Sequence, residues 1–106
     1  MKLVVVLCAF PNLDVAKKIA TTLVELRLAA CVNVCPGVES IYRWQGKVES
    51  AEEVLALIKT TRAGFEALEQ KLRELHPYEV PEIIALPAER VSSAYARWVH
   101  KSVAES

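Results

Sequence analysis

Residues 76–82 place an imidazole, a phenol and two carboxylates close together in the chain. The side chains belong to His76, Tyr78, Glu79 and Glu82, and prolines stand at positions 77 and 81. Proline restricts its own backbone and disfavours a helical conformation in the residue before it. We therefore expect a stiff loop that presents these polar groups directly after a helix ending near Leu75.

Cys8 and His76 are candidate metal ligands, because thiol and imidazole donors suit copper and zinc. The spacing motifs of established zinc sites, such as C-x-x-C and H-E-x-x-H, do not occur in the sequence. Two ligands from one chain do not complete a tetrahedral site. The residues alone therefore leave two interpretations open: a metal-binding pair, or a core thiol and an ordinary hydrogen-bonded histidine.

Two arrangements could support catalysis. Cys31 would become a nucleophile if His76 lay within hydrogen-bonding distance as its base. Glu79 and Glu82 could act as acid and base, coordinate a cation, or pair with basic side chains of a neighbouring subunit. Nothing in the sequence indicates an oxyanion hole, and residues 9–12 lack the arginine that would cradle a phosphate in an acylphosphatase-like loop. We therefore expect a protein without catalytic activity.

Polar and aromatic side chains interrupt the strand predicted at residues 30–44. Asn33 lies among apolar residues and predicts a buried amide that needs hydrogen-bond partners. Cys31 and Cys35, four residues apart, should share one face as buried thiols. Tyr42 and Trp44 share a face with Ser40, and these aromatic rings, like Tyr78, Tyr95 and Trp98, are either packing anchors or walls of a ligand site.

The hydrophobic pattern predicts four strands and three helices. Strands are expected at residues 3–9, 30–44, 47–61 and 81–87, and helices from 11 to 28, over 65–75 and around Trp98. Pro36-Gly37 predicts a bend, and Gln45-Gly46 predicts a hairpin turn. The order βαββαβ with a terminal helix is typical of the α+β ferredoxin-like fold, a four-stranded antiparallel sheet with two helices on one face.

The predicted hairpin is too long for a domain of this size. A ladder from Lys47 to Thr61 spans about 45–50 Å at about 3.3 Å per residue, whereas such a domain has a radius of gyration of about 13 Å. The tip should therefore project, unless the strand breaks near residues 49–53. A projecting ribbon that carries Ile41, Tyr42 and Trp44 would be a sticky edge, so we expect other copies of the chain to cover it.

Composition restricts the class of protein. The chain has 106 residues, 53% of them hydrophobic, which predicts a single domain over residues 1–106. Equal numbers of acidic and basic side chains, without a basic run, argue against nucleic-acid binding. No apolar segment is long enough to cross a bilayer. Three cysteines in apolar surroundings suit a reducing compartment, so we expect a cytoplasmic protein.

Several motifs taken together resemble the CutA family of divalent-cation-tolerance proteins, and the resemblance covers nearly the whole chain. The motifs are Ala29-Ala30-Cys31-Val32-Asn33, Pro36-Gly37, Ser40-Ile41-Tyr42-Arg43-Trp44-Gln45-Gly46-Lys47, Ile58-Lys59-Thr60-Thr61, His76-Pro77-Tyr78-Glu79-Val80-Pro81-Glu82 and Trp98. The resemblance implies a ferredoxin-like subunit, similar to P-II signal proteins, in a tight homotrimer built through extended hairpins. It also implies tolerance to copper and other divalent cations.

The resemblance also implies particular site residues. Copper binding in the family is associated with a cysteine at the end of the first strand and with histidines before a Pro-Tyr pair, positions that correspond to Cys8 and His76. This chain has Leu75 where some members carry a second histidine. The family's recurrent polar residues gather in clefts between subunits, which here implies a cleft of Cys31, Asn33, Tyr42, Trp44, Lys59, His76, Tyr78, Glu79 and Glu82.

The leading hypothesis from the sequence is thus a cytoplasmic homotrimer that binds a divalent cation such as copper and acts in metal tolerance. Two alternatives remain: a P-II-like module that binds a small anionic ligand, and a small hydrolase in the cleft between subunits with His76 or Glu79 as base. The short turn at Gly46 argues against the P-II-like alternative, because a mobile ligand-responsive loop would be expected there.

Overall fold

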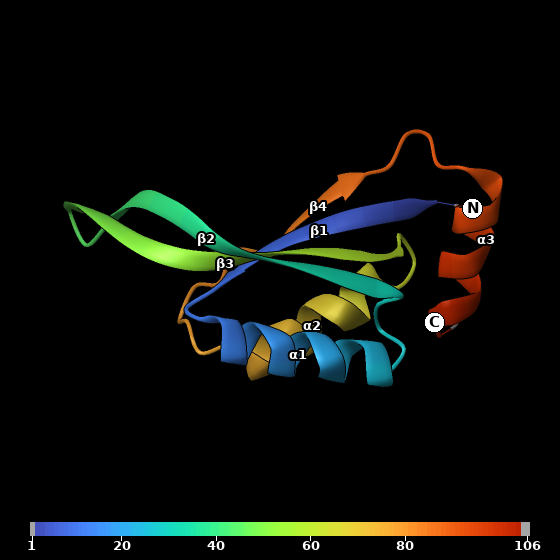
Figure 1. The fold of residues 1–106 in the computed structure, drawn as a ribbon, viewed down its shortest axis with the longest axis horizontal. Coiled ribbons are helices and arrows are strands. Elements are labelled where there is room, and N and C mark those ends of the chain that lie inside the picture. The colour runs from blue at the N-terminus through green and yellow to red at the C-terminus, as the bar shows by residue number, and fades with distance from the viewer. Residues whose placement is uncertain (1, 105–106) are drawn as a thin grey trace.

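A computed structural model describes residues 2–104 and contains a four-stranded antiparallel sheet and three helices (Figure 1). The elements are β1 (Leu3–Phe10), α1 (Leu13–Glu25), β2 (Cys31–Trp44), β3 (Lys47–Thr61), α2 (Phe65–Leu75), β4 (Ile84–Pro87) and α3 (Ser93–Ser102). The strand order is β2-β3-β1-β4. The predicted ferredoxin-like α+β arrangement is confirmed. The apolar strand β3 lies in the interior of the sheet, between β2 and β1.

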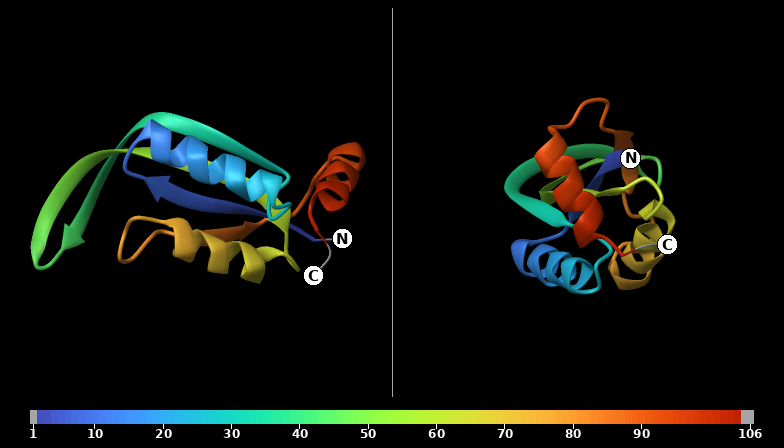
Figure 2. Two further views of the ribbon diagram at one scale, coloured as in Figure 1. Left: turned by 90° about the horizontal axis from the view of Figure 1, so that it is seen from below. Right: turned by 90° about the vertical axis from the view of Figure 1, so that its right-hand side faces the viewer.

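Helices α1 and α2 cover one face of the sheet and form the core with it (Figures 1 and 2). Alternation along β1 points Val6, Cys8 and Phe10 toward the helices, where Leu23 of α1 and Leu72 of α2 meet them. All five side chains are buried to within 1% of full burial. This packing gives the chain a hydrophobic core of its own. None of the helices in residues 2–104 has the length and apolar character needed to cross a membrane.

The opposite face of the sheet, which we call the open face, has no helix across its middle (Figure 1). The ladder aligns its apolar side chains across three strands: Leu7 is level with Leu57 and Ile84, and Val5 is level with Leu86. Ile84 and Leu86 remain 47% and 46% exposed. Helix α3 packs only at one end, where Val99 joins a separate small cluster. The open face is therefore an apolar surface that the chain itself does not cover.

The β2–β3 hairpin extends beyond the rest of the chain (Figures 1 and 2). The principal extents of the described structure, hairpin included, are 44 × 25 × 22 Å. β1 pairs with β3 only from residue 54 to residue 61, so residues 47–53 of β3 pair with β2 alone. We call this two-stranded part, residues 38–53, the outer hairpin. Its Ile41 and Val48 are 73% and 67% exposed. β3 is continuous through residues 49–53, so the strand does not break there and the tip projects as expected.

Two predicted turns have the expected backbone. Gln45 and Gly46 both have positive φ, of 50° and 80°, which is the geometry of a two-residue hairpin turn with the twist of the flanking strands. Pro36-Gly37 does not divide β2 into two strands. It forms an irregularity at which the register shifts between Cys35 and Val38, with Gly37 at φ 78°.

Three predicted boundaries are wrong. The first helix ends at Glu25 rather than Leu28, because Arg27 takes a left-handed conformation with φ 60° that a helix cannot continue through. β1 continues one residue further, to Phe10. The last strand begins at Ile84 rather than residue 81, since only Ile84–Pro87 pairs with β1.

Candidate functional site

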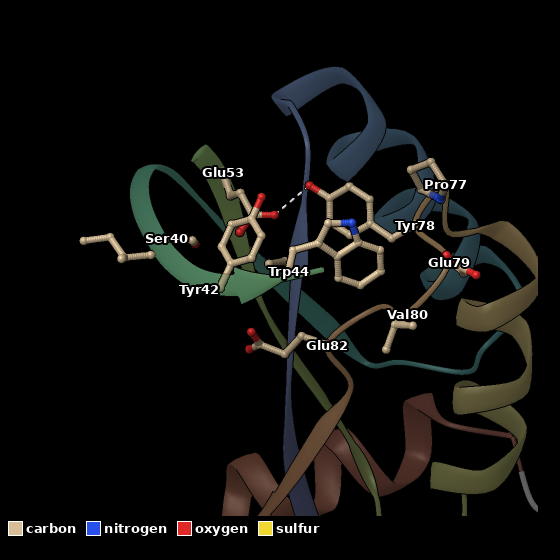
Figure 3. Close-up of a pocket in the computed structure, with 11 residues that line it drawn as sticks. Ser40, Tyr42, Trp44, Glu53, Pro77, Tyr78, Glu79, Val80 and Glu82 are labelled. Atoms are coloured by element: carbon tan, nitrogen blue, oxygen red, sulfur yellow. Dashed lines mark hydrogen bonds between the residues drawn. The ribbon is translucent and has the colours of Figure 1, made fainter. Parts of the chain in front are cut away.

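A pocket of about 710 Å³ lies where the outer hairpin meets the loop at residues 77–82 (Figure 3). Its lining residues come from β1, β2, β3 and that loop: Ala9, Ser40, Ile41, Tyr42, Trp44, Glu53, Pro77, Tyr78, Glu79, Val80 and Glu82. Strand alternation puts Ser40, Tyr42 and Trp44 on the same side of β2, as predicted. The proline-bounded loop supplies the opposite wall. The pocket therefore combines a long strand pair with a loop that contains two prolines.

A hydrogen bond between Tyr78 and Glu53 joins the two walls of the pocket. The Tyr78 hydroxyl donates to Glu53 Oε2 at 2.6 Å (Figure 3). Glu53 is only 9% exposed, although it is a glutamate on a projecting ribbon. Burial of Tyr78 and this hydrogen bond raise the pKa of the phenol above its ordinary value. The phenol therefore stays protonated and serves as a donor.

His76 lies directly behind the pocket, with both ring nitrogens engaged. The backbone amide of Tyr78 donates to Nδ1 at 3.1 Å, so Nε2 carries the proton and donates to the carbonyl of Ala9 at 2.8 Å. The ring stacks on Phe10 with centroids 4.8 Å apart. Burial lowers the pKa of His76, and the bond to Ala9 and the charge of Glu53 oppose that shift in part. The histidine is thus a neutral link between loop and strand.

Cys8 is fully buried beneath the same region, on the helix-covered face of β1. Burial raises the pKa of its thiol to about 12, and the carboxylates of Glu82 and Glu53 add to the shift. The thiolate, which is the form that binds metals, is therefore disfavoured at neutral pH. Among residues 2–104, no three His, Cys, Asp or Glu side chains converge closely enough to hold a metal ion.

Three other predicted cleft residues, Cys31, Asn33 and Lys59, lie away from the pocket, on the open face near α3. Cys31 is level with Lys59 in the ladder, and Lys59 is level with Val5. The Cys31 thiol interacts with Tyr95 of α3, whose pKa is raised mainly by burial and secondarily by that thiol. Within one chain, the predicted cleft residues therefore lie in two separate groups, one around the pocket and one on the open face.

For the second group, one alternative does not hold within one chain, and one expectation is wrong. His76 bonds to Ala9, four strand positions from Val5, so about 13 Å of strand separates it from the level of Cys31. Cys31 and His76 therefore cannot form a nucleophile–base pair in a single subunit. Asn33 is exposed rather than buried, because β2 is an edge strand and the open face above it is uncovered.

Sequence reasoning did not select Glu53, the buried carboxylate of the pocket. The available signal was its position directly before the apolar run at residues 54–58, where the strand enters the body of the protein. A charged residue at such an entry point needs a partner, and Tyr78 provides it from a distant segment.

Comparisons with known proteins agree on one family. Residues 4–102 match the model of the CutA1 divalent ion tolerance protein. The chain is 50% identical over 98 residues to the divalent-cation tolerance protein CutA of Thermus thermophilus, covering 92% of this chain and 95% of that protein. It is 52% identical over 96 residues to human protein CutA, covering 91% of this chain and 53% of the human protein, about half its length.

Comparison with solved structures indicates the same family. The crystal structure of CutA1 from Oryza sativa superposes with a TM-score of 0.97 at 40% identity, covering all of this chain and 97% of that one. The matched residues include both walls of the pocket, Cys8 and His76. The chain therefore belongs to the CutA1 family of divalent ion tolerance proteins.

Proposed function

We propose that the chain acts in divalent-cation tolerance as a cytoplasmic homotrimer without catalytic activity, and that copper is among the ions it binds. The observation that carries the proposal is the match to the CutA1 divalent ion tolerance model over residues 4–102. The three free cysteines support a reducing compartment. The separation of Cys31 from His76 weighs against a nucleophile–base pair of these two residues within one subunit.

Cys8 and His76 remain the proposed metal ligands, and their surroundings set the expected affinity. A soft thiol and an imidazole suit copper, but neither is free in the subunit described. Coordination at His76 requires loss of the bond to Ala9 or to the amide of Tyr78. The buried thiol of Cys8 must also lose its proton. We therefore expect copper binding of weak to moderate affinity, with proton release.

A copper titration tests these ligands. Untagged protein is titrated as wild type, Cys8→Ala and His76→Ala, with Cys35→Ala and His100→Ala as matched controls on other parts of the chain. We expect weaker binding only in the first two variants, with circular dichroism showing that each remains folded. Equal affinity in all five proteins would remove the metal assignment at these residues.

The homotrimer is supported by the surfaces that a single subunit leaves uncovered. The outer hairpin exposes Ile41 and Val48, and the open face exposes Ile84 and Leu86. Isolated hairpins are marginally stable in water, and closed rotational symmetry covers such surfaces without forming fibres. Analytical ultracentrifugation at micromolar concentration should give three times the subunit mass. A stable monomer at that concentration would contradict the proposal.

A further inference from the structure

The pocket at the base of the outer hairpin has a chemical character that metal binding does not explain. Its eleven lining residues include three aromatic rings and three carboxylates, and no lysine, arginine or histidine. The rings of Tyr42, Trp44 and Tyr78 stand around the carboxylate of Glu53, with Glu82 at the opposite side (Figure 3). Such a lining attracts positive charge and also offers apolar surface.

Glu53 is the one lining carboxylate that is removed from water. It is more than nine-tenths buried, and no Lys or Arg forms an ion pair with it within the described part of the chain. Its Oε2 accepts a hydrogen bond from the hydroxyl of Tyr78, a neutral partner. A carboxylate has about four acceptor positions on two oxygens. Glu53 thus has acceptor positions beyond the one that Tyr78 uses, and a negative charge that no cation of the subunit neutralises.

The spacing of the carboxylates favours an organic cation over a metal ion. Hard metal ions take several oxygen ligands at short distance, and residues 2–104 contain no such cluster. Aromatic faces beside a single buried carboxylate suit a larger and more weakly hydrated cation, because the ring faces carry negative charge. The volume of about 710 Å³ also lies in the range of small-molecule sites, which is roughly 300–1,000 Å³.

We propose that this pocket binds the protonated primary amine of a small organic molecule or of a lysine side chain. The ammonium group donates hydrogen bonds to Glu53 and lies against the rings of Trp44 and Tyr78. The alkyl part lies toward Val80 at the rim. A primary amine is favoured over a quaternary ammonium ion, since only the former has N–H donors for a carboxylate. The inference does not depend on the metal assignment at Cys8 and His76.

A chemical-shift titration of isotope-labelled protein in the presence of a metal chelator tests the proposal. The probes are n-butylammonium, its neutral counterpart n-butanol, and blocked lysine with a free or an acetylated side-chain amine. We expect saturable shifts around Glu53 and Tyr78 with the two amines, weakening as salt is added, and at least tenfold weaker binding of the neutral probes. If n-butylammonium binds more tightly than blocked lysine, the ligand is a small organic amine. If blocked lysine binds more tightly, the ligand is a lysine side chain.

Variants decide whether the pocket itself is responsible. Glu53→Gln keeps an acceptor for Tyr78 but removes the charge, and should weaken amine binding at least tenfold. Glu52→Gln is the matched control, because the neighbouring residue points to the opposite side of β3 and is exposed. Trp44→Leu, on the exposed hairpin, tests the ring independently if Glu53→Gln does not fold.

Three results would overturn the proposal. The first is the absence of saturable binding of either amine, as expected if a neighbouring subunit's side chain already fills the pocket. The second is equal binding of n-butanol and n-butylammonium. The third is unchanged amine binding in both Glu53→Gln and Trp44→Leu. Because chelator is present throughout, each of these results is independent of whether copper binds at Cys8 and His76.

Discussion

The two faces of the sheet differ in how their apolar side chains are used. On the helix-covered face, Val6, Ile58 and Leu72 are fully buried within one subunit. On the open face and the outer hairpin, residues of the same types, such as Ile41 and Ile84, remain 73% and 47% exposed. The first face stabilises the fold, whereas the second is available for contacts with other molecules. Residue type alone does not distinguish the two roles.

The largest expected effect lies on the helix-covered face. Leu72→Ala should lower the free energy of unfolding by about 2–5 kcal/mol, because it leaves a cavity among α1, α2 and the sheet. Leu75→Ala, one turn along the same helix at a 37% exposed position, is the matched control and should cost clearly less. Urea denaturation measures both, and equal losses would mean that α2 does not pack as described.

The second effect should separate assembly from folding. Leu57→Lys places a charge at the centre of the open face, where a partner subunit would have to desolvate it. We expect at least tenfold weaker self-association with unchanged circular dichroism. Ala67→Lys, on the exposed side of α2, is the control and should assemble normally. An unchanged assembly in Leu57→Lys would show that the open face is not the contact surface.

The third prediction concerns the link between the hairpin and the body. Tyr78→Phe should cost about 1–3 kcal/mol, because Glu53 stays buried without its hydrogen-bond donor. Tyr95→Phe removes a hydroxyl of a 37% exposed residue that interacts with the Cys31 thiol, and it should cost less. Thermal or chemical denaturation at one protein concentration compares the two variants. If Tyr78→Phe lowers the free energy of unfolding less than Tyr95→Phe does, the hydrogen bond between Tyr78 and Glu53 contributes little to stability.

The smallest expected effect is a dependence of stability on pH. The pKa of His76 is lowered by burial in the folded protein, so the unfolded chain binds the extra proton more readily. The stabilisation is complete above the ordinary value of 6.5 and is lost as the pH falls through the lowered pKa. His76→Gln should reduce this dependence, whereas His100→Gln on α3 should not. A pH profile that is identical in wild type and His76→Gln would contradict this assignment.

Much of the fold followed from local pattern, because helices and strands depend on spacings that neighbouring residues carry. The strand β1, the turn at Gln45-Gly46 and the loop at residues 76–82 after α2 were predicted correctly. Boundaries were less predictable. The left-handed conformation of Arg27 and the late start of β4 at Ile84 depend on contacts with other segments, including the bonds of the Arg27 side chain to carbonyls of Lys101 and Ser102.

The candidate site was predictable in residue types and only partly in arrangement. Tyr42, Trp44 and Tyr78 do line one pocket, as an aromatic site would require. Glu53 was not selected, since its burial depends on a hydrogen bond across 25 positions of sequence. Cys31 and His76, which the resemblance assigns to one cleft between subunits, lie at different levels of the sheet within one chain.

The amino-acid sequence by itself determined the order of elements, the length of the hairpin and the presence of a polar loop between two prolines, because each depends on residues close together in the chain. The tertiary structure decided which side chains meet: that Glu53 is buried against Tyr78, that both nitrogens of His76 are occupied, and that Cys31 lies elsewhere. Those distances depend on strand order and register, which bring together residues that no local pattern connects.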